Sequence, residues 1–270
     1  MTVSSHGPDR PAYRPDRAAL VHRLRAAGCV YAEDEAELLI AAADSVEALA
    51  GLVDRRVAGA PLEYVLGWAE FCGERIAVDP GVFVPRARTA LLVDAAVAVT
   101  GPAAAVVDLC CGSGATTVAL ARRLAPRWLA AADVDPAAVA CARRNLAPLA
   151  VPVFEGDLYD PLPVRWRGRL DLVLANAPYV PTAAVALMPP EARLHEAPVA
   201  LDGGPDGLTV LRRVAEGAAR WLAPGGHLVV EAGQAQVDAL CAALTAVGLH
   251  PTVSHDDERD ATAVTARRPR

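Results

Sequence analysis

The chain has 270 residues, a formal net charge of −6, 53% hydrophobic residues and 21% charged residues. This length fits one large or two small domains with ample material for a core, and the negative charge argues against a protein that mainly coats nucleic acid. Apolar stretches fall short of the roughly 20 residues that span a membrane, and the polar N-terminus lacks the pattern of a signal peptide. Six scattered cysteines without a Cys-x-x-Cys pair predict reduced thiols, a cytoplasmic protein and no metal site.

The first part of the chain divides into a polar arm and a helical region. Residues 1–15 contain serine, glycine and three prolines, a composition typical of a disordered arm. Over residues 16–60, apolar residues recur at helical spacing and predict a small domain of two or three helices. Gly28 and Gly59 stand where helices should end, and Asp44 or Ser45 is suited to cap a helix start.

Residues 61–86 change character, because apolar and polar residues alternate around Gly73 and the turn Asp79-Pro80-Gly81. This pattern predicts a β-hairpin linker. A single larger domain is expected over residues 87–270.

Strands and helices alternate in this larger domain. Strands are expected at 104–109, 128–132, 151–154, 170–175 and 227–231, with two late strands near 251–255 and 262–266. Helices are expected at 116–124, 136–145, 207–222 and 236–247. This order predicts an α/β fold with a mostly parallel, seven-stranded sheet covered on both faces. In such sheets a ligand binds outside the carboxyl ends of the strands, where the strand order reverses.

A glycine loop follows the first of these strands. The stretch VVDLCCGSGATTVAL (106–120) places Gly112 and Gly114 between a strand and a helix, where glycine allows a sharp turn and close approach of a ligand. No Lys-Ser/Thr pair follows, and the third glycine of a dinucleotide fingerprint is missing. The loop therefore favours a nucleoside ligand such as S-adenosylmethionine, and Asp108 is placed to meet its ammonium group.

Acidic residues after the next two strands strengthen this interpretation. A carboxylate at the end of the second strand can accept hydrogen bonds from both ribose hydroxyls, and Asp133 fits that position. Asp135 is a near alternative, but we expect it to cap the helix that begins at Pro136. Asp157, after the third strand, is placed to accept the exocyclic amine of adenine.

These segments resemble the HemK/PrmC group of protein-glutamine methyltransferases, which use S-adenosylmethionine to methylate a glutamine side-chain amide in peptide-chain release factors. The resemblance runs from about Arg55 to the C-terminus. It rests on the stretches RRVAGAPLEYVLGWAEF (55–71), VFVPR (82–86), DLCCGSG (108–114), NAPY (176–179), LDGGPDGL (201–208) and LAPGGHLVVEAGQAQ (222–236).

The resemblance implies a Rossmann-like methyltransferase domain, a helical domain at residues 16–60 that recognises the substrate, and a protein substrate, with a monomer and no stable nucleic-acid binding expected. Pro85 resembles the stretch that covers the entrance for cofactor and substrate. The residues expected at the cofactor are Pro85, Asp108, Cys110, Gly112, Gly114, Asp133, Val134, Asp157, Leu158 and Asn176. The catalytic loop is expected to be Asn176, Ala177, Pro178 and Tyr179.

The catalytic loop suits amide chemistry. An amide nitrogen is a poor nucleophile because its lone pair is delocalised into the carbonyl. The side-chain oxygen of Asn176 and the main-chain carbonyl of Ala177 can accept hydrogen bonds from its two N–H groups, while Tyr179 forms an aromatic wall. Positioning, rather than a general base, would then carry the rate. Glu231 and Gln234, which follow the fifth strand, are expected to support this loop.

The chain departs from the family pattern at two places on the acceptor side. The family usually has Asn-Pro-Pro-Tyr where this chain has Asn-Ala-Pro-Tyr, so the fixed φ of one proline is lost. It usually carries an acidic run after VPR, where this chain has Ala87-Arg88-Thr89-Ala90. Retained chemistry with a changed rate or substrate is expected.

Three other functions stay open on the sequence alone. A related motif serves DNA adenine methyltransferases, which hold the amine of a flipped base in a comparable way. The same residues also fit a small-molecule methyltransferase, or a cofactor-binding protein without turnover.

Overall fold

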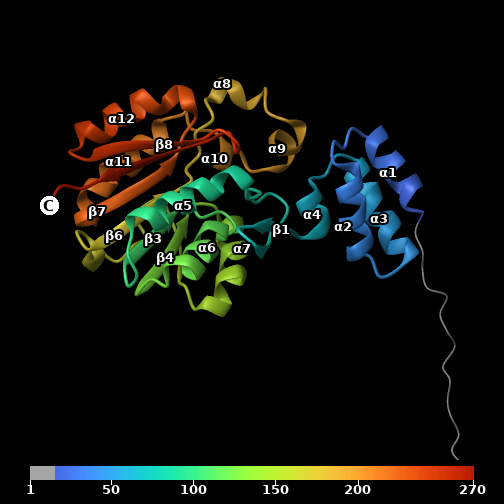
Figure 1. Cartoon of the computed structure of the whole chain (residues 1–270), viewed down its shortest axis with the longest axis horizontal. Coiled ribbons are helices and arrows are strands. Elements are labelled where there is room, and N and C mark those ends of the chain that lie inside the picture. The colour runs from blue at the N-terminus through green and yellow to red at the C-terminus, as the bar shows by residue number, and fades with distance from the viewer. Residues whose placement is uncertain (1–15) are drawn as a thin grey trace, which may run out of the picture. The chain divides into compact units, whose positions relative to one another are not determined.

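The computed structural model describes residues 16–270, so the predicted arm at residues 1–15 lies outside the described residues. The chain separates into two compact units that divide after Leu66. The helices of the first unit are α1 (Arg17–Ala26), α2 (Ala32–Ala42) and α3 (Val46–Val57), shown in blue in Figure 1, and α4 (Leu62–Leu66), shown in blue-green. Ser45 caps α3 by accepting a hydrogen bond from the Ala48 N–H at 3.0 Å. The core of this unit is built from Leu20, Leu24, Ala36, Leu39, Leu49, Val53 and Val65.

A buried ion pair joins α2 to α3 in this helical unit. The guanidinium of Arg56 donates from Nε to Glu35 Oε2 at 2.6 Å and from Nη2 to Glu35 Oε1 at 3.0 Å. The two side chains are only 7% and 10% exposed. Removing one partner therefore leaves a charge buried without its counterion.

Glu35→Ala is expected to lower the free energy of unfolding of the helical unit by about 3–5 kcal/mol, because a buried charge that has lost its partner is strongly destabilising. Amide hydrogen exchange of α2 and α3 in the full chain measures this loss. Glu37→Ala, which removes the exposed partner of Arg17, is the control and should cost less than about 1 kcal/mol. Equal, small losses in the two variants would contradict the prediction.

A short hairpin opens the second unit. Strands β1 (Trp68–Phe71) and β2 (Glu74–Ala77) pair antiparallel. The hairpin is shorter than the expected 61–86, because residues 62–66 continue the helical unit as α4. Asn145 fixes the end of β2: its Oδ1 accepts from the Ala77 N–H at 2.9 Å, and its Nδ2 donates to the carbonyls of Ala77 at 2.9 Å and Ser113 at 2.8 Å.

The second unit is built on a seven-stranded sheet. Its strands are β3 (Ala105–Leu109), β4 (Trp128–Asp133), β5 (Val153–Glu155), β6 (Leu170–Ala175), β7 (Leu222–Glu231), β8 (His250–Asp256) and β9 (Ala261–Arg267). They lie in the order β5-β4-β3-β6-β7-β9-β8, and β9 runs antiparallel to both of its neighbours. This is the mostly parallel α/β sheet that the sequence predicts. The strand order reverses between β3 and β6.

Helices cover both faces of this sheet. Figure 1 shows α5 (Ala90–Val99), α6 (Ala115–Leu124) and α7 (Pro136–Leu146) on one face, with α11 (Thr209–Trp221) and α12 (Val237–Ala246) on the other. Each face has its own apolar core, because successive strand residues point to opposite sides. Three short helices, α8 (Thr182–Val185), α9 (Pro190–His195) and α10 (Pro198–Leu201), lie between β6 and α11. Among the described residues, no helix has the length and apolar character to cross a membrane.

Candidate active site

A cavity of about 320 Å³ lies at the carboxyl ends of β3, β4, β5 and β6, around the point where the strand order reverses. Its lining comes from the loops after these strands, from residues 83–89 and from residues 188–202. All of the predicted site residues except Asp108 and Gly114 contribute to it. These lining residues are Pro85, Cys110, Gly112, Asp133, Val134, Asp157, Leu158, Asn176, Ala177, Pro178 and Tyr179.

Asp133 organises the glycine loop. Its Oδ2 accepts from the Gly112 N–H at 2.8 Å, and its Oδ1 accepts from the Asp135 N–H at 2.9 Å. Burial raises the pKa of Asp133. Asp135 caps α7 by accepting from the Ala137 N–H at 2.9 Å, as the sequence predicts. Gly114 precedes α6 with a φ of +82°, and a Cβ added there would stand 3.2 Å from a side-chain carbon of Leu146.

Asp108 lies beneath the glycine loop and not in the cavity wall. Its side chain is fully buried, and the hydroxyls of Thr116 and Thr117 donate to its Oδ2 at 2.6 Å and 2.5 Å. Its Oδ1 has no hydrogen-bond partner within residues 16–270. Burial raises the pKa of Asp108 to about 6. The carboxylate ties β3 to α6 through these bonds, and its contact with a ligand ammonium group stays a prediction.

The raised pKa makes Asp108 a source of pH-dependent stability. Because the folded state favours the protonated carboxyl, this contribution is fully present below the ordinary value of 3.8 and is lost as pH rises through about 6. Relative to Asp108→Asn, the parent should lose roughly 3 kcal/mol of unfolding free energy across this window. Urea unfolding of both proteins between pH 4 and pH 7 measures the difference. A difference that stays constant with pH would exclude the effect.

Asp157 has a basic partner that the sequence did not reveal. Arg213 Nη2, from α11, donates to Asp157 Oδ2 at 2.6 Å, and both residues line the cavity. The ion pair is half-exposed, with 50% and 45% of the two side chains accessible. An adenine amine at Asp157 would therefore share the carboxylate with a guanidinium.

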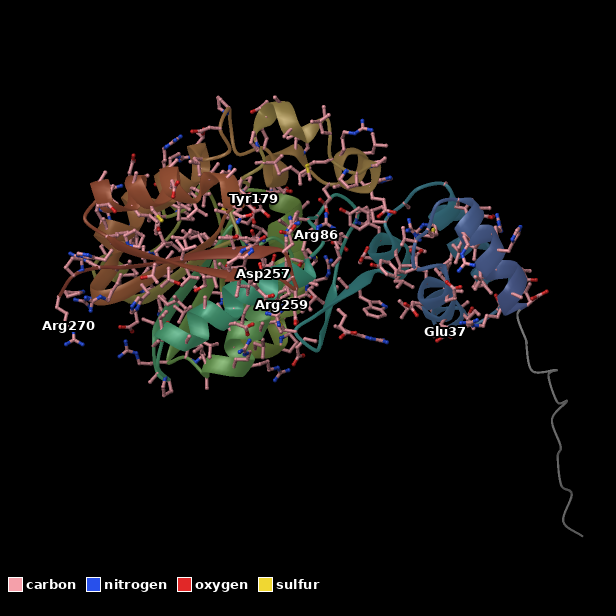
Figure 2. The ribbon with its side chains drawn as sticks, turned by 45° about the horizontal axis from the view of Figure 1, so that its top comes forward. Glu37, Arg86, Tyr179, Asp257, Arg259 and Arg270 are labelled. Carbon is pink, nitrogen blue, oxygen red and sulfur yellow. The ribbon has the colours of Figure 1, made fainter. Side chains whose placement is uncertain are left out.

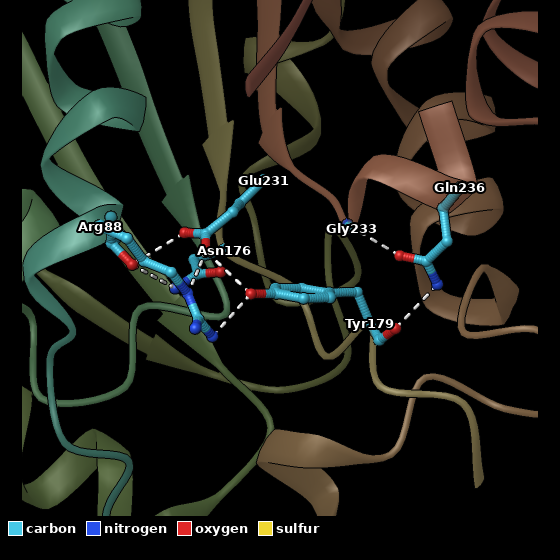
Figure 3. Close-up of polar contacts among 7 residues, drawn as sticks. Arg88, Asn176, Tyr179, Glu231, Gly233 and Gln236 are labelled. Atoms are coloured by element: carbon cyan, nitrogen blue, oxygen red, sulfur yellow. Dashed lines mark hydrogen bonds and ion pairs between the residues drawn. The ribbon is translucent and has the colours of Figure 1, made fainter. Parts of the chain in front are cut away.

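The segment 176–180 is held by the glycine-rich stretch that follows it. The Val180 N–H donates to the Leu201 carbonyl at 3.1 Å, and the Gly203 N–H donates to the Val180 carbonyl at 2.8 Å. Gln236 Nε2 donates to the Tyr179 carbonyl at 2.8 Å, as Figure 3 shows. Support therefore comes from Gln236, two residues beyond the expected Gln234. Ala177 is only 1% exposed and belongs to the core, so packing restrains the position where the family has proline.

A polar network lies behind Asn176 and Tyr179 (Figure 3). The Tyr179 hydroxyl donates to Glu231 Oε1 at 2.8 Å and accepts from Arg88 Nη2 at 2.9 Å. Thr89 Oγ1 donates to Glu231 Oε2 at 2.8 Å and accepts from Asn176 Nδ2 at 3.3 Å. Burial and the Glu231 charge raise the pKa of Tyr179, so its hydroxyl stays protonated. Glu231 supports the loop as expected, whereas Arg88 and Thr89 were not predicted.

Glu196 holds the segment 81–86, which contributes to the cavity lining, through hydrogen bonds. Glu196 Oε1 accepts from the Val84 N–H at 3.1 Å and from Arg86 Nη2 at 2.6 Å. The Arg86 guanidinium lies 5.0 Å from the ring centre of Phe83, and both residues line the cavity. Arg86 and Tyr179, labelled in Figure 2, bring a cation and an aromatic ring to the cavity lining.

The cavity suits S-adenosylmethionine. Its volume lies in the range of roughly 300–1,000 Å³ of small-molecule sites. The space where a Cβ of Gly112 would stand is open, so a ligand can approach the backbone there. Burial raises the pKa of Cys110 and Cys111 well above the usual thiol value, so both thiols stay neutral. Among the described residues, no group of acidic, cysteine and histidine side chains is arranged to hold a metal ion.

Comparisons with known proteins agree with this fold and site. The family model described as "Methyltransferase small domain" matches residues 75–210. The release factor glutamine methyltransferase of Geobacter sulfurreducens is 40% identical over 207 residues, which cover 76% of this chain and 72% of the relative. The 4-amino-L-phenylalanine/4-methylamino-L-phenylalanine methyltransferase of Streptomyces pristinaespiralis is 37% identical over 205 residues, which cover 73% of this chain and 69% of the relative.

A solved structure shows the same fold. The crystal structure of a methyltransferase from Pyrococcus furiosus superposes with a TM-score of 0.58 at 14% identity, covering 74% of this chain and 91% of the other. The family model spans the segment from β2 to α11, which contains the cofactor loop and the NAPY segment. The chain belongs to the HemK/PrmC family of release factor glutamine methyltransferases and is an S-adenosylmethionine-dependent methyltransferase.

Proposed function

We propose that this methyltransferase modifies the side-chain amide nitrogen of a glutamine in a protein, and that its acceptor is the Gly-Gly-Gln loop of a peptide-chain release factor. The names of several relatives at 39–43% identity support this acceptor. The observation that carries the proposal is the placement of Asn176 and Tyr179 together in the cavity lining, on a loop held by Gln236 and Glu231.

The proposed mechanism relies on orientation of the acceptor amide. S-adenosylmethionine supplies a methyl group on a positively charged sulfur. Asn176 Oδ1 and the Ala177 carbonyl would accept from the two N–H groups of the acceptor amide, which would orient its nitrogen and favour a localised lone pair. The rings of Tyr179 and Phe83 confine the planar amide. The nitrogen would gain the methyl group as the carbon–sulfur bond of the cofactor breaks, the sulfur would keep the electron pair as the neutral thioether S-adenosylhomocysteine, and the nitrogen would lose one proton to solvent without a general base.

We assign the cofactor to the other end of the same cavity. Gly112 offers its backbone and Asp133 its carboxylate for the ribose, while Asp157 lies where adenine would reach. These roles are supported by shared lining of one cavity. The remaining residues proposed at the cofactor are Pro85, Cys110, Gly114, Val134 and Leu158, whereas Asn176 is assigned to the acceptor. Asp108 acts through Thr116 and Thr117 in α6.

We further propose that residues 16–60 recognise the acceptor protein. The enzyme would act in the cytoplasm as a monomer without stable nucleic-acid binding. The net charge of −6 supports the last point.

A methyl-transfer assay tests the proposed acceptor. Purified release factor and its Gln→Ala variant in the Gly-Gly-Gln loop are incubated with the enzyme and methyl-labelled S-adenosylmethionine. Label should enter the parent factor and not the variant. Equal labelling of both factors would reject the glutamine of the Gly-Gly-Gln loop as the acceptor. Absence of label in both factors, while the enzyme still binds cofactor, would reject it as well.

A second candidate acceptor is the amine of a free amino acid. The relative from Streptomyces pristinaespiralis is named for 4-amino-L-phenylalanine. Arg88 and Arg86, at the acceptor side, offer cations to a carboxylate, although both are paired here with Glu231 and Glu196. The same assay with 4-amino-L-phenylalanine in place of release factor separates the two candidates, because each predicts label in a different product.

A further inference from the structure

The buried carboxylate of Glu231 fixes the direction of the hydrogen bonds behind the catalytic loop. Glu231 is 4% exposed and stands at the end of β7. Glu231 Oε1 pairs with Arg88 Nε at 3.1 Å, and a carboxylate paired with a guanidinium accepts hydrogen bonds and donates none. The hydroxyl of Thr89, which has a single proton, must therefore donate it to Glu231 Oε2 across the observed 2.8 Å. Thr89 is itself 3% exposed, so little water competes for that proton.

Because the Thr89 hydroxyl already donates its proton to Glu231, it determines which end of the Asn176 amide faces Thr89 Oγ1. With its proton directed at Glu231, Thr89 Oγ1 can only accept, and Asn176 presents Nδ2 to it at 3.3 Å. The reversed amide would bring two acceptor oxygens together with no proton between them. The amide of Asn176 therefore turns its Oδ1 away from Thr89, and Asn176 lines the cavity.

We propose that Thr89, held by Glu231, is a positioning residue that keeps the Asn176 amide with its oxygen available to the N–H of the methyl acceptor. This inference rests on the proposed function only in requiring an acceptor nitrogen that carries hydrogen. Glu231 also accepts from Tyr179, so one carboxylate aligns the hydrogen-bond acceptor Asn176 and the aromatic wall Tyr179 (Figure 3). Thr89 directly precedes α5 and lies far in the sequence from its two partners, Glu231 and Asn176.

The amide orientation can be observed directly by nuclear magnetic resonance. The sequence contains two asparagines, Asn145 and Asn176, so asparagine labelled with ¹⁵N gives two side-chain amide signals. Asn176→Asp removes one of them and assigns the pair. Asn145 is an internal reference, because its Nδ2 donates to two carbonyls. We expect a nuclear Overhauser contact between the Asn176 NH₂ and Thr89, with exchange slower than in a free amide.

Two substitutions separate the hydroxyl of Thr89 from its shape. Thr89→Val keeps the shape and removes the hydroxyl, so the Asn176 NH₂ should exchange faster while that of Asn145 is unchanged. Thr89→Ser keeps the hydroxyl and should preserve slow exchange. Absence of the contact with Thr89 in the parent, or identical exchange of the Asn176 amide in parent and Thr89→Val, would overturn the inference whatever the acceptor is.

Kinetics supply the second readout. Thr89→Val should lower kcat at least about 10-fold, as expected when a reacting group is misplaced, with the dissociation constant of the cofactor unchanged. Thr89→Ser should restore most of the rate. Thr262→Val, which removes another buried hydroxyl that contacts His255, is the control and should keep the parental rate. Equal rates for Thr89→Val and the parent would contradict the inference.

The two proposals fail in different ways. A parent enzyme that leaves release factor unlabelled refutes the proposed acceptor, and the resonance experiment then decides the role of Thr89 alone. If the parent labels release factor but the Asn176 amide shows no contact with Thr89, the proposed function stands and the positioning role of Thr89 is refuted.

Discussion

Asn176→Ala should abolish most methyl transfer, with kcat reduced roughly 100- to 1,000-fold, the scale seen when one preorganised hydrogen-bonding group of an active site is removed. The substitution takes away the side-chain oxygen that holds the acceptor nitrogen in line. It does not remove the hydrogen bond between Asp133 and the Gly112 N–H of the glycine loop. Single-turnover transfer from labelled cofactor and equilibrium cofactor binding measure the two quantities separately.

The pattern of the two measurements identifies the role of Asn176. A large loss of kcat with near-parental cofactor affinity is the expected result. Loss of cofactor affinity by a similar factor would mean that Asn176 serves the cofactor and not the acceptor. Asn176→Ala at the parental rate would refute the amide-holding mechanism outright.

Gly207→Ala should damage both stability and catalysis. Gly207 has a φ of +73°, and a Cβ there would stand 2.2 Å from Gln236 Nε2 and 2.2 Å from the Tyr179 carbonyl oxygen. The left-handed backbone costs a side chain about 1–2 kcal/mol, and overpacking adds about 1–3 kcal/mol. Relief of the clash must displace the loop that carries Tyr179. We expect a fall in kcat of about 10-fold or more, because small displacements of reacting groups are costly.

Gly248→Ala is the matched control for this substitution. Gly248 has a φ of +83° and no heavy atom within 4 Å of the added Cβ. It should therefore show the backbone penalty alone, with parental kcat. Chemical unfolding and steady-state kinetics of the two variants separate strain from clash. If Gly207→Ala behaved like Gly248→Ala in both assays, the proposed contact between this glycine and the catalytic loop would be unimportant.

The sheet was largely predictable because its strands are local patterns. β6 runs over Leu170–Ala175, as the predominantly apolar run LDLVLA predicts, and β3 differs from its predicted start by one residue. Helix α5 was missed. Its sequence ALLVDAAVAV is apolar on nearly every side, so it lacks the periodicity that marks an amphipathic helix. The hairpin was overextended because residues 62–66 alternate too weakly to separate a strand from a short helix.

The site was predictable only where its residues share a motif. Asn176 and Tyr179 follow one strand, and Gly112 follows another, so a local pattern marks them. Glu231 and Thr89 lie 142 residues apart and meet through the fold. Asp108 was assigned to the ligand because it precedes the glycine loop. The alternation of strand side chains does not say whether its carboxylate meets a ligand or the helix above it.

Asn145 connects the glycine loop at the cofactor site to the hairpin of β1 and β2. One side chain bonds both the carbonyl of Ser113 in that loop and the backbone of Ala77 at the end of the hairpin. When ordering of one segment favours ordering of a second segment bonded to the same side chain, reciprocity requires the second to favour the first by the same free energy. We therefore expect a nucleoside bound at the loop to order the hairpin, and fraying of the hairpin to weaken nucleoside binding by the same coupling free energy.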